Sequence, residues 1–289
     1  MNQISKNQIC FVFIRDDLAS SKVRGKQIAD KLQLPCFKFS LEKALSYKII
    51  IYVKLLPSLE EMKILNEDGI IQIVDLLDNY NERNINKRAN FIDSFIAASM
   101  THKVWIQERF KKKAYIIPHH HYNTSGKKNN VKKDWPLSIG YVGDEKYWKY
   151  NRHIERFQEH KIIKDIDYDN LHSIYSSLDI ASAARGDKQK SSLNSNLKLL
   201  NYMSYGIPCV ASPESSYLEI ARHGEECLFA QNNKEFLSFT DLLLNDYELR
   251  LKISENAYKS AKKFHISNII KIYKKIISQY EKYVDQNED

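Results

Sequence analysis

The sequence predicts an α/β protein of two domains, each a parallel sheet with helices on both faces. Three observations lead to this fold class. The chain has 289 residues, which suits two domains of roughly 100–200 residues each. Short apolar runs alternate with amphipathic stretches, and continuous apolar runs are typical of strands buried on both faces. This alternation stops at a polar, basic segment, 124–135, and then starts again.

The first half contains the elements of one such domain. Apolar runs predict strands at 9–14, 36–39, 48–53, 70–76, 94–98 and 114–118. Apolar residues that recur every three or four positions predict helices at 21–32, 59–66 and 101–110. We therefore assign residues 1–123 to an N-terminal domain and treat 124–135 as the linker.

The second half repeats the pattern and ends in helices. Strands are predicted at 137–142, 179–182 and 208–211, and helices at 170–177, 196–205, 215–222, 234–244, 247–264 and 267–284. Residues 136–289 form the C-terminal domain, whose last helix is expected to pack back on the first domain. Little room is left between Val142 and Asp165 for a further strand, helix and strand, which indicates either a trimmed sheet or a degenerate domain.

Composition limits the location and the partners. The net charge of +8 permits nucleic acid, a membrane surface or a phosphorylated ligand as partner. Basic side chains interleaved with aromatic platforms are missing, which disfavours nucleic acid. Four scattered cysteines, apolar runs too short to cross a bilayer and an N-terminus unlike a signal peptide predict a cytoplasmic protein. The basic charge also suits peripheral contact with the inner face of a membrane.

Several motifs are weak signals of chemistry. Neither glycine-rich nucleotide motif, G-x-G-x-x-G or G-x-x-x-x-G-K-S/T, occurs. The acids Asp165, Asp167 and Asp169 form D-x-D patterns that bind metal in some sugar transferases, but helix capping is the favoured interpretation. Adjacent residues of an extended chain point to opposite faces, so the run 119–121 of histidines does not chelate one ion easily. Either a single histidine of this run faces a ligand crevice, or the run is a set of polar residues at the end of a strand. No metal or cofactor is expected.

The stretch 198–206 carries a stronger signal. Lys198 and Asn201 lie on one face near the start of a predicted helix, where backbone N–H groups attract phosphates. Gly206 suits the left-handed cap that ends this helix, and Pro208 prevents its continuation. Gly143, directly after a strand, either lets a phosphate approach the backbone or forms a plain tight turn.

Three segments of the C-terminal half follow one another in a recognisable order: KLLNYMSYGIPCVAS at 198–212, YLEIARHGEECLFA at 217–230 and the helical run at 232–264. These segments resemble the GT-B glycosyltransferases of the family 4, or group 1, type. That family shows K-L-L-E-A/Y-M-A-x-G-x-P-V-V-A-S, then a Glu before a glycine-containing turn, then a helix ending in N-A. The resemblance implies two Rossmann-like domains facing each other across a cleft.

The resemblance also implies roles for single residues. His119 and Arg185 would be catalytic, and Arg24, in a segment similar to S-x-R-x-R-G, would lie on the acceptor side. The donor would be bound by residues that follow the strands and begin the helix of the C-terminal domain: Gly143, Lys146, Lys190, Lys198, Asn201 and Glu219. Asn201 departs from the family, which has a Glu there for the ribose hydroxyls. The first acid of the E-x7-E pattern falls at Leu193, so that motif is absent.

These residues lead to an expected activity. The family transfers a sugar from a nucleotide-diphosphate donor to an acceptor, here a glycan or lipid-linked acceptor of surface polysaccharide synthesis, by a metal-independent and retaining reaction. A non-catalytic GT-B relative that acts as a binding or scaffolding subunit is the alternative, because the family's acids are missing.

Overall fold

The computed structural model describes residues 8–77, 81–143, 160–163, 170–184 and 193–287. The chain forms two units, which we call unit 1 (Met1–His119 with Ile266–Asp289) and unit 2 (His120–His265). The division differs from the sequence-based boundaries at the segment 124–135, which was expected to be a linker and lies inside unit 2. The last helix groups with unit 1, the domain on which it was expected to pack.

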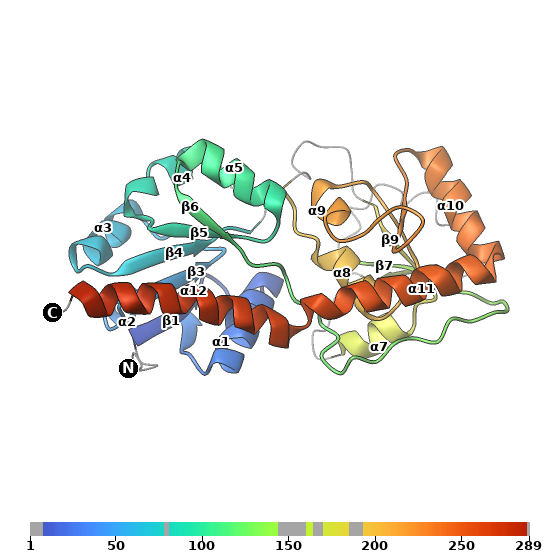
Figure 1. The fold of residues 1–289 in the computed structure, drawn as a ribbon, viewed down its shortest axis with the longest axis horizontal. Helices are drawn as coiled ribbons and strands as arrows, with labels where there is room; N and C mark the ends of the chain where they lie inside the picture. Colours follow the sequence, from blue (N-terminus) through green and yellow to red (C-terminus); the bar gives the residue numbers. More distant parts are fainter. Residues whose placement is uncertain (1–7, 78–80, 144–159, 164–169, 185–192, 288–289) are drawn as a thin grey trace. The chain divides into compact units, whose positions relative to one another are not determined.

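Unit 1 is built on a six-stranded parallel sheet in the order β2-β1-β3-β4-β5-β6. The strands are β1 (Ile9–Phe13), β2 (Cys36–Lys38), β3 (Ile49–Val53), β4 (Ile71–Asp75), β5 (Ser94–Ala97) and β6 (Lys113–Ile116). The helices are a π-helical turn η2 (Ser21–Lys26), α1 (Gln27–Leu32), α2 (Leu41–Ala44), α3 (Leu59–Glu67), α4 (Glu82–Asn86), η3 (Ala89–Phe91), α5 (Met100–Phe110) and α12 (Ile266–Asn287). Figure 1 shows α12 lying over this sheet.

Both faces of the unit 1 sheet are covered, which explains its continuous apolar strands. Alternate residues of β1 point to opposite faces. Phe11 packs in a core with α1 and α12, whereas Val12 packs in a second core with α3 and α5. A parallel sheet buried on both sides needs apolar residues at every position of its central strands, and the sequence ICFVF of β1 supplies them.

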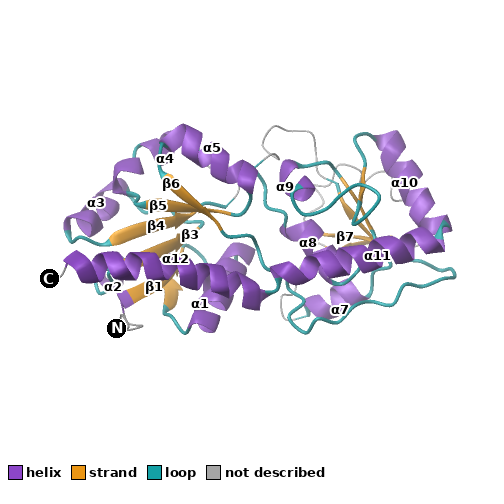
Figure 2. Cartoon of the chain, in the orientation of Figure 1, coloured by secondary structure: helices purple, strands orange, loops and turns teal. Residues whose placement is uncertain are grey.

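Unit 2 has a five-stranded parallel sheet in the order β11-β10-β9-β7-β8. Its strands are β7 (Ile139–Val142), β8 (His160–Ile163), β9 (Ile180–Ala183), β10 (Cys209–Ala211) and β11 (Leu228–Phe229). Its helices are α7 (Leu171–Ser176), α8 (Leu197–Ser204), α9 (Ser215–Leu218), α10 (Asn233–Asn245), α11 (Tyr247–Ala261) and the short η6 (Lys262–Phe264). Figure 2 shows strands between helices here as in unit 1. Two of these strands were not predicted: β8, which lies between Val142 and Asp165, and β11, which extends the other edge of the sheet.

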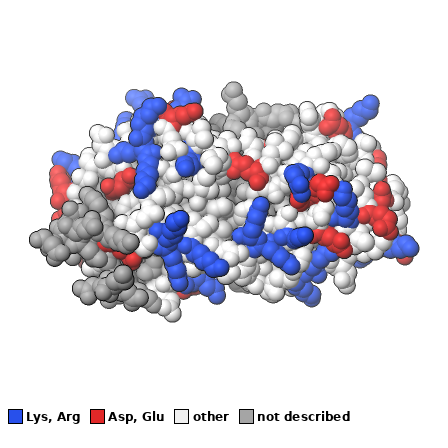
Figure 3. Space-filling view, viewed as in Figure 1, with Lys and Arg blue, Asp and Glu red and all other residues white. Residues whose placement is uncertain are grey.

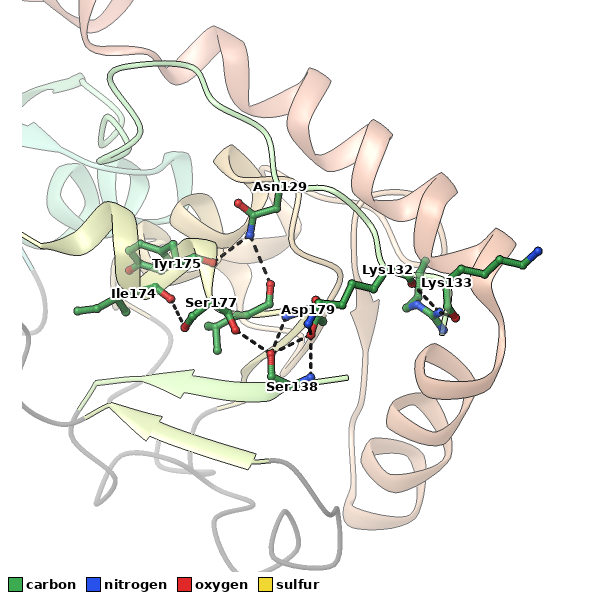
Figure 4. A network of polar contacts seen from close by, with 10 residues as sticks. Asn129, Lys132, Lys133, Ser138, Ile174, Tyr175, Ser177 and Asp179 are labelled. Carbon is green, nitrogen blue, oxygen red and sulfur yellow. Dashed lines mark hydrogen bonds and ion pairs between the residues drawn. The ribbon is translucent and has the colours of Figure 1, made fainter. Parts of the chain in front are cut away.

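Side chains hold the segment 124–135 to unit 2 (Figure 4). The carboxylate of Asp179 accepts hydrogen bonds from the Ser138 amide at 2.8 Å and from the Lys132 ammonium at 2.9 Å. Asn129 donates to the carbonyl of Tyr175 at 3.0 Å. The buried Arg250 donates to the carbonyls of Lys132 and Lys133. A polar, basic composition therefore did not mark a flexible linker, because its polar groups are used in these contacts.

Two surface properties bear on a membrane contact. Among the helices of the described ranges, none combines the length and apolar character needed to cross a bilayer. On the face seen in Figure 3, Lys and Arg side chains occur over both units and acidic side chains lie among them.

Candidate functional site

The carboxyl edge of the unit 2 sheet has an opening between its two central strands. Strand β7 pairs with β9 only at Ile139 with Ile180 and Gly140 with Ala181, although β7 continues along β8 and β9 continues along β10. The chain runs from β7 to β8 on one side and returns to β9 on the other, so β7 and β9 flank the topological switch point. Ligands of open α/β sheets bind outside the carboxyl ends of the strands at such a point.

Two side chains of α8 occupy this opening. The Lys198 ammonium donates a hydrogen bond to the carbonyl of Val142, the last residue of β7, and lies 4.0 Å from the centre of the Tyr141 ring. One helical turn later, the hydroxyl of Tyr202 accepts a hydrogen bond from the Val142 amide at 2.9 Å. Both backbone polar groups at the end of β7 are therefore bound by α8 instead of by β9.

Gly143 lies against the same lysine. Its φ of +139° is a conformation that favours glycine, and a Cβ there would meet the Lys198 ammonium. Gly140, within β7, is required for a different reason. The Leu178 side chain packs directly on its backbone and leaves no space for a Cβ. The structure thus brings together two residues predicted to bind the donor, Gly143 and Lys198.

Asn201 follows Lys198 on α8 and is buried, with 2% of its surface exposed. Its side-chain oxygen accepts a hydrogen bond from the Tyr122 amide at 3.0 Å. The neighbouring Asn123 donates to the carbonyl of Ser204 near the end of α8. In this structure Asn201 fixes the start of unit 2 to α8, a role that its position in the sequence did not indicate.

Arg24 lies in the core of unit 1, away from solvent. It is fully buried, and its guanidinium donates two hydrogen bonds of 2.8 Å to the carboxylate of Asp75. A third nitrogen donates to the carbonyls of Ile117 at 2.7 Å and Pro118 at 3.1 Å. Tyr273 of α12 donates to the same carboxylate. The acceptor-side assignment of Arg24 is not supported by this position, because all of its donor groups hold other parts of unit 1.

The three histidines are separated by the boundary between the units. His119 is the last residue of unit 1 before the chain enters unit 2, directly after the two carbonyls that Arg24 holds, and is 3% exposed. His120 and His121 belong to unit 2. Burial, followed by the neighbouring charge of His265, lowers the pKa of His121 from 6.5 to about 4, and the two rings lie 5.8 Å apart.

The remaining predicted site residues divide into two groups. Glu219 is exposed and ends the short helix α9, which follows β10 at the carboxyl edge of the sheet. Lys146, Arg185 and Lys190 lie outside the described residues, as do the acids of the D-x-D patterns. Within the described ranges, no cluster of three or more His, Cys, Asp or Glu side chains has the arrangement of a metal site.

Two residues of these contacts, Tyr202 and Asp75, were not predicted from the sequence. Tyr202 stands four residues after Lys198, so both project from one face of a helix, and this spacing was a usable signal. The signal at Asp75 was weaker: it is the single acid that ends the buried run IQIVD. Chemically, a lysine beside a glycine turn at a helix N-terminus is an arrangement that binds anions, phosphates above all.

The fold and this edge define a class: a protein of two doubly wound α/β units, the second with a lysine and a glycine turn at its switch point. The sequence profile described as glycosyl transferase-like matches residues 106–270, more than half of the chain. The chain therefore belongs to the glycosyl transferase-like family. No curated protein sequence matches it significantly.

Solved structures with a similar fold include glycosyltransferases. Anabaena Alr3699/HepE, solved in complex with UDP and glucose, has a TM-score of 0.68 and 12% identity, over 95% of this chain and 99% of that one. A glycosyltransferase from Rickettsia africae ESF-5 has a TM-score of 0.64 and 12% identity, over 94% of this chain and 98% of that one. The lipopolysaccharide outer core galactosyltransferase WaaB has a TM-score of 0.59 and 13% identity, over 94% of this chain and 99% of that one. Identities this low show the fold alone, and that fold is the predicted GT-B type.

Proposed function

We propose that this glycosyltransferase takes its sugar from a nucleotide-diphosphate donor bound by unit 2 at the opening between β7 and β9. The observation that carries the proposal is the position of Lys198, whose ammonium lies beside Gly143 at the switch point of the sheet. The complexes of HepE with UDP and with UDP-glucose support a nucleotide-sugar as the donor class.

The chemistry explains why a lysine there would matter. When the bond between the sugar and the diphosphate breaks, negative charge develops on the leaving nucleotide. A fixed cation and the N-terminus of α8 stabilise that charge more in the transition state than in the ground state. Lys198 now donates to a neutral carbonyl, and a diphosphate is a stronger partner for an ammonium because such hydrogen bonds are charge-assisted.

The finer points of the proposal come from the family resemblance. We propose a metal-independent, retaining transfer in which His119 and Arg185 act near the reacting atoms. The acceptor is proposed to be a glycan or lipid-linked glycan of surface polysaccharide synthesis, with peripheral contact to an anionic membrane and no nucleic acid partner.

Thermal unfolding against UDP, GDP, ADP, CMP and dTDP, with and without magnesium, tests donor binding. A nucleotide at about a hundred times its dissociation constant should stabilise the fold by about 2.7 kcal/mol, a shift of several degrees. Lys198→Ala should weaken binding about ten- to a hundredfold, because it removes a charged hydrogen bond. Lys252→Ala is the matched control, since Lys252 lies on α11 in an exposed ion pair with Glu225.

A binding or scaffolding subunit is the second candidate, and the contact of Asn201 favours it. The side-chain oxygen at this position already accepts the Tyr122 amide, whereas the family has an acid there for the ribose. Nucleotide binding without release of sugar from any sugar nucleotide of that base would support this candidate. No binding by any nucleotide at millimolar concentration would contradict the proposed donor site.

A further inference from the structure

The opening between β7 and β9 is held by contacts that the sequence motif does not explain. Beyond Gly140 and Ala181 the two strands no longer pair. The groups that would continue the ladder are bound elsewhere: the Val142 amide donates to the Tyr202 hydroxyl, and the Val142 carbonyl accepts from Lys198. A buried backbone group without a partner costs about 1–3 kcal/mol, so these side chains determine how β7 ends.

We propose that Tyr202 is a positioning residue of the donor site, whose hydroxyl keeps the end of β7 apart from β9 and presents Gly143 and Lys198 to the nucleotide. The inference rests on the proposed function, and it adds a residue that does not touch the donor. In this proposal Lys198 supplies the positive charge. Tyr202 fixes the end of β7, to which the Lys198 ammonium is hydrogen-bonded.

The surroundings of Tyr202 suit this role. Its side chain is fully buried, and its ring packs edge to face with Tyr175 at 5.7 Å. Burial raises the pKa of Tyr202 well above its usual value of 10.0, so the hydroxyl keeps its proton at any physiological pH. A rigid, neutral side chain with one oxygen at its tip holds an amide at a fixed distance, which a flexible side chain cannot do at the same entropic cost.

The test compares two tyrosine-to-phenylalanine variants of neighbouring positions. Tyr202→Phe keeps the ring and removes the oxygen that accepts the Val142 amide. Tyr205→Phe is the matched control, because Tyr205 is also buried and stacks on Tyr175 at 5.1 Å. The dissociation constant of UDP is measured by calorimetry, far below the unfolding temperature, and amide hydrogen exchange is followed at Val142 without ligand.

Tyr202→Phe should bind UDP about tenfold more weakly, the effect of one lost hydrogen bond on a site it positions, while Tyr205→Phe stays within about twofold of the wild type. The Val142 amide should exchange faster in Tyr202→Phe only. A purely structural role would lower the unfolding temperature and leave the UDP affinity of the folded protein unchanged, and that outcome overturns the inference. A wild type that binds none of the five nucleotides overturns the proposed function, and this inference with it.

Discussion

The two units share one topology, yet their switch points differ. In unit 1, β1 and β3 pair over their whole length, from Ile9 with Ile49 to Phe13 with Val53. In unit 2, pairing between the corresponding strands β7 and β9 stops at Gly140 and Ala181. Where the pairing of β7 with β9 ends early, the amide and carbonyl of Val142 bond to the Tyr202 and Lys198 side chains of α8.

The two units also differ in the burial and the partners of a basic side chain, Arg24 in unit 1 and Lys198 in unit 2. Arg24 of unit 1 is fully buried and bound to the carboxylate of Asp75 and to two carbonyls. Lys198 of unit 2 is half-buried, and its ammonium donates to the Val142 carbonyl and lies over the Tyr141 ring. A buried ion pair cannot exchange its partner without leaving a charge unpaired, so Arg24 is held in the core of unit 1. Lys198 is the cation that the proposed donor site would use.

The largest effect is expected from Asp75→Asn in unit 1. The substitution leaves the buried Arg24 charge without its counter-charge, so the free energy of unfolding should fall by about 3–5 kcal/mol. Urea unfolding measures this fall in the free energy of unfolding. Arg15→Ala is the control, because the Arg15 and Asp17 pair is exposed on both sides, and it should leave stability unchanged. A loss below about 1 kcal/mol for Asp75→Asn would show that the buried pair of Arg24 and Asp75 contributes no more than an exposed pair.

Acid should destabilise unit 2 through His121. Its pKa is 6.5 when unfolded and about 4 when folded, so the unfolded state binds the proton first as the pH falls. The stability is fully present above pH 6.5 and is lost progressively toward pH 4, by roughly 3 kcal/mol in total. Urea unfolding as a function of pH measures this slope.

His121→Asn should flatten the pH dependence of unfolding between pH 6.5 and about 4, because the side chain no longer titrates. The exposed His172 of α7 provides the matched control, and His172→Asn should keep the wild-type slope. Equal slopes for the wild type and His121→Asn would show that another group is responsible.

Two glycine variants compare the turn at Gly143 with a turn in unit 1. In Gly143→Ala the alanine must adopt the φ of +139°, which is strained for any residue with a Cβ, and this Cβ meets the Lys198 ammonium. The variant should lose about 1–3 kcal/mol of stability and bind UDP more weakly. Gly69→Ala has a φ of +70° with no atom within 4 Å of the added carbon, so it should cost about 1 kcal/mol and leave UDP binding unchanged. Urea unfolding and calorimetry give both values. Equal UDP binding by the two variants would place the nucleotide away from Gly143.

The smallest effect is expected from Lys132→Ala in the segment 124–135. The Lys132 side chain is 56% exposed in its pair with Asp179, and such pairs contribute about 0–1 kcal/mol. Asp179→Ala should cost more, because Asp179 is mostly buried and also accepts from Ser138. Urea unfolding ranks the two variants. If Lys132→Ala costs more than Asp179→Ala, the anchor of this segment is the lysine instead of the carboxylate.

Local pattern predicted most of the elements and part of the site. The runs at 9–14 and 48–53 became β1 and β3 because both faces of their sheet are buried. Gly206 ends α8 with a φ of +66°, as the capping pattern indicated. The segment 124–135 was misassigned because composition does not show where polar groups find partners, and Asp179 and Arg250 lie far away in sequence.

By itself, the sequence determined the α/β fold class, the order of its elements and the lysine near the start of a helix, because hydrophobic period and helix caps depend on nearby residues. Only the tertiary structure decided that Arg24 is a core residue bound to Asp75 and that Tyr202 ends the pairing of β7. These facts depend on which strands become neighbours and where their pairing stops. Those contacts join residues 51 and 60 positions apart, and no local pattern encodes them.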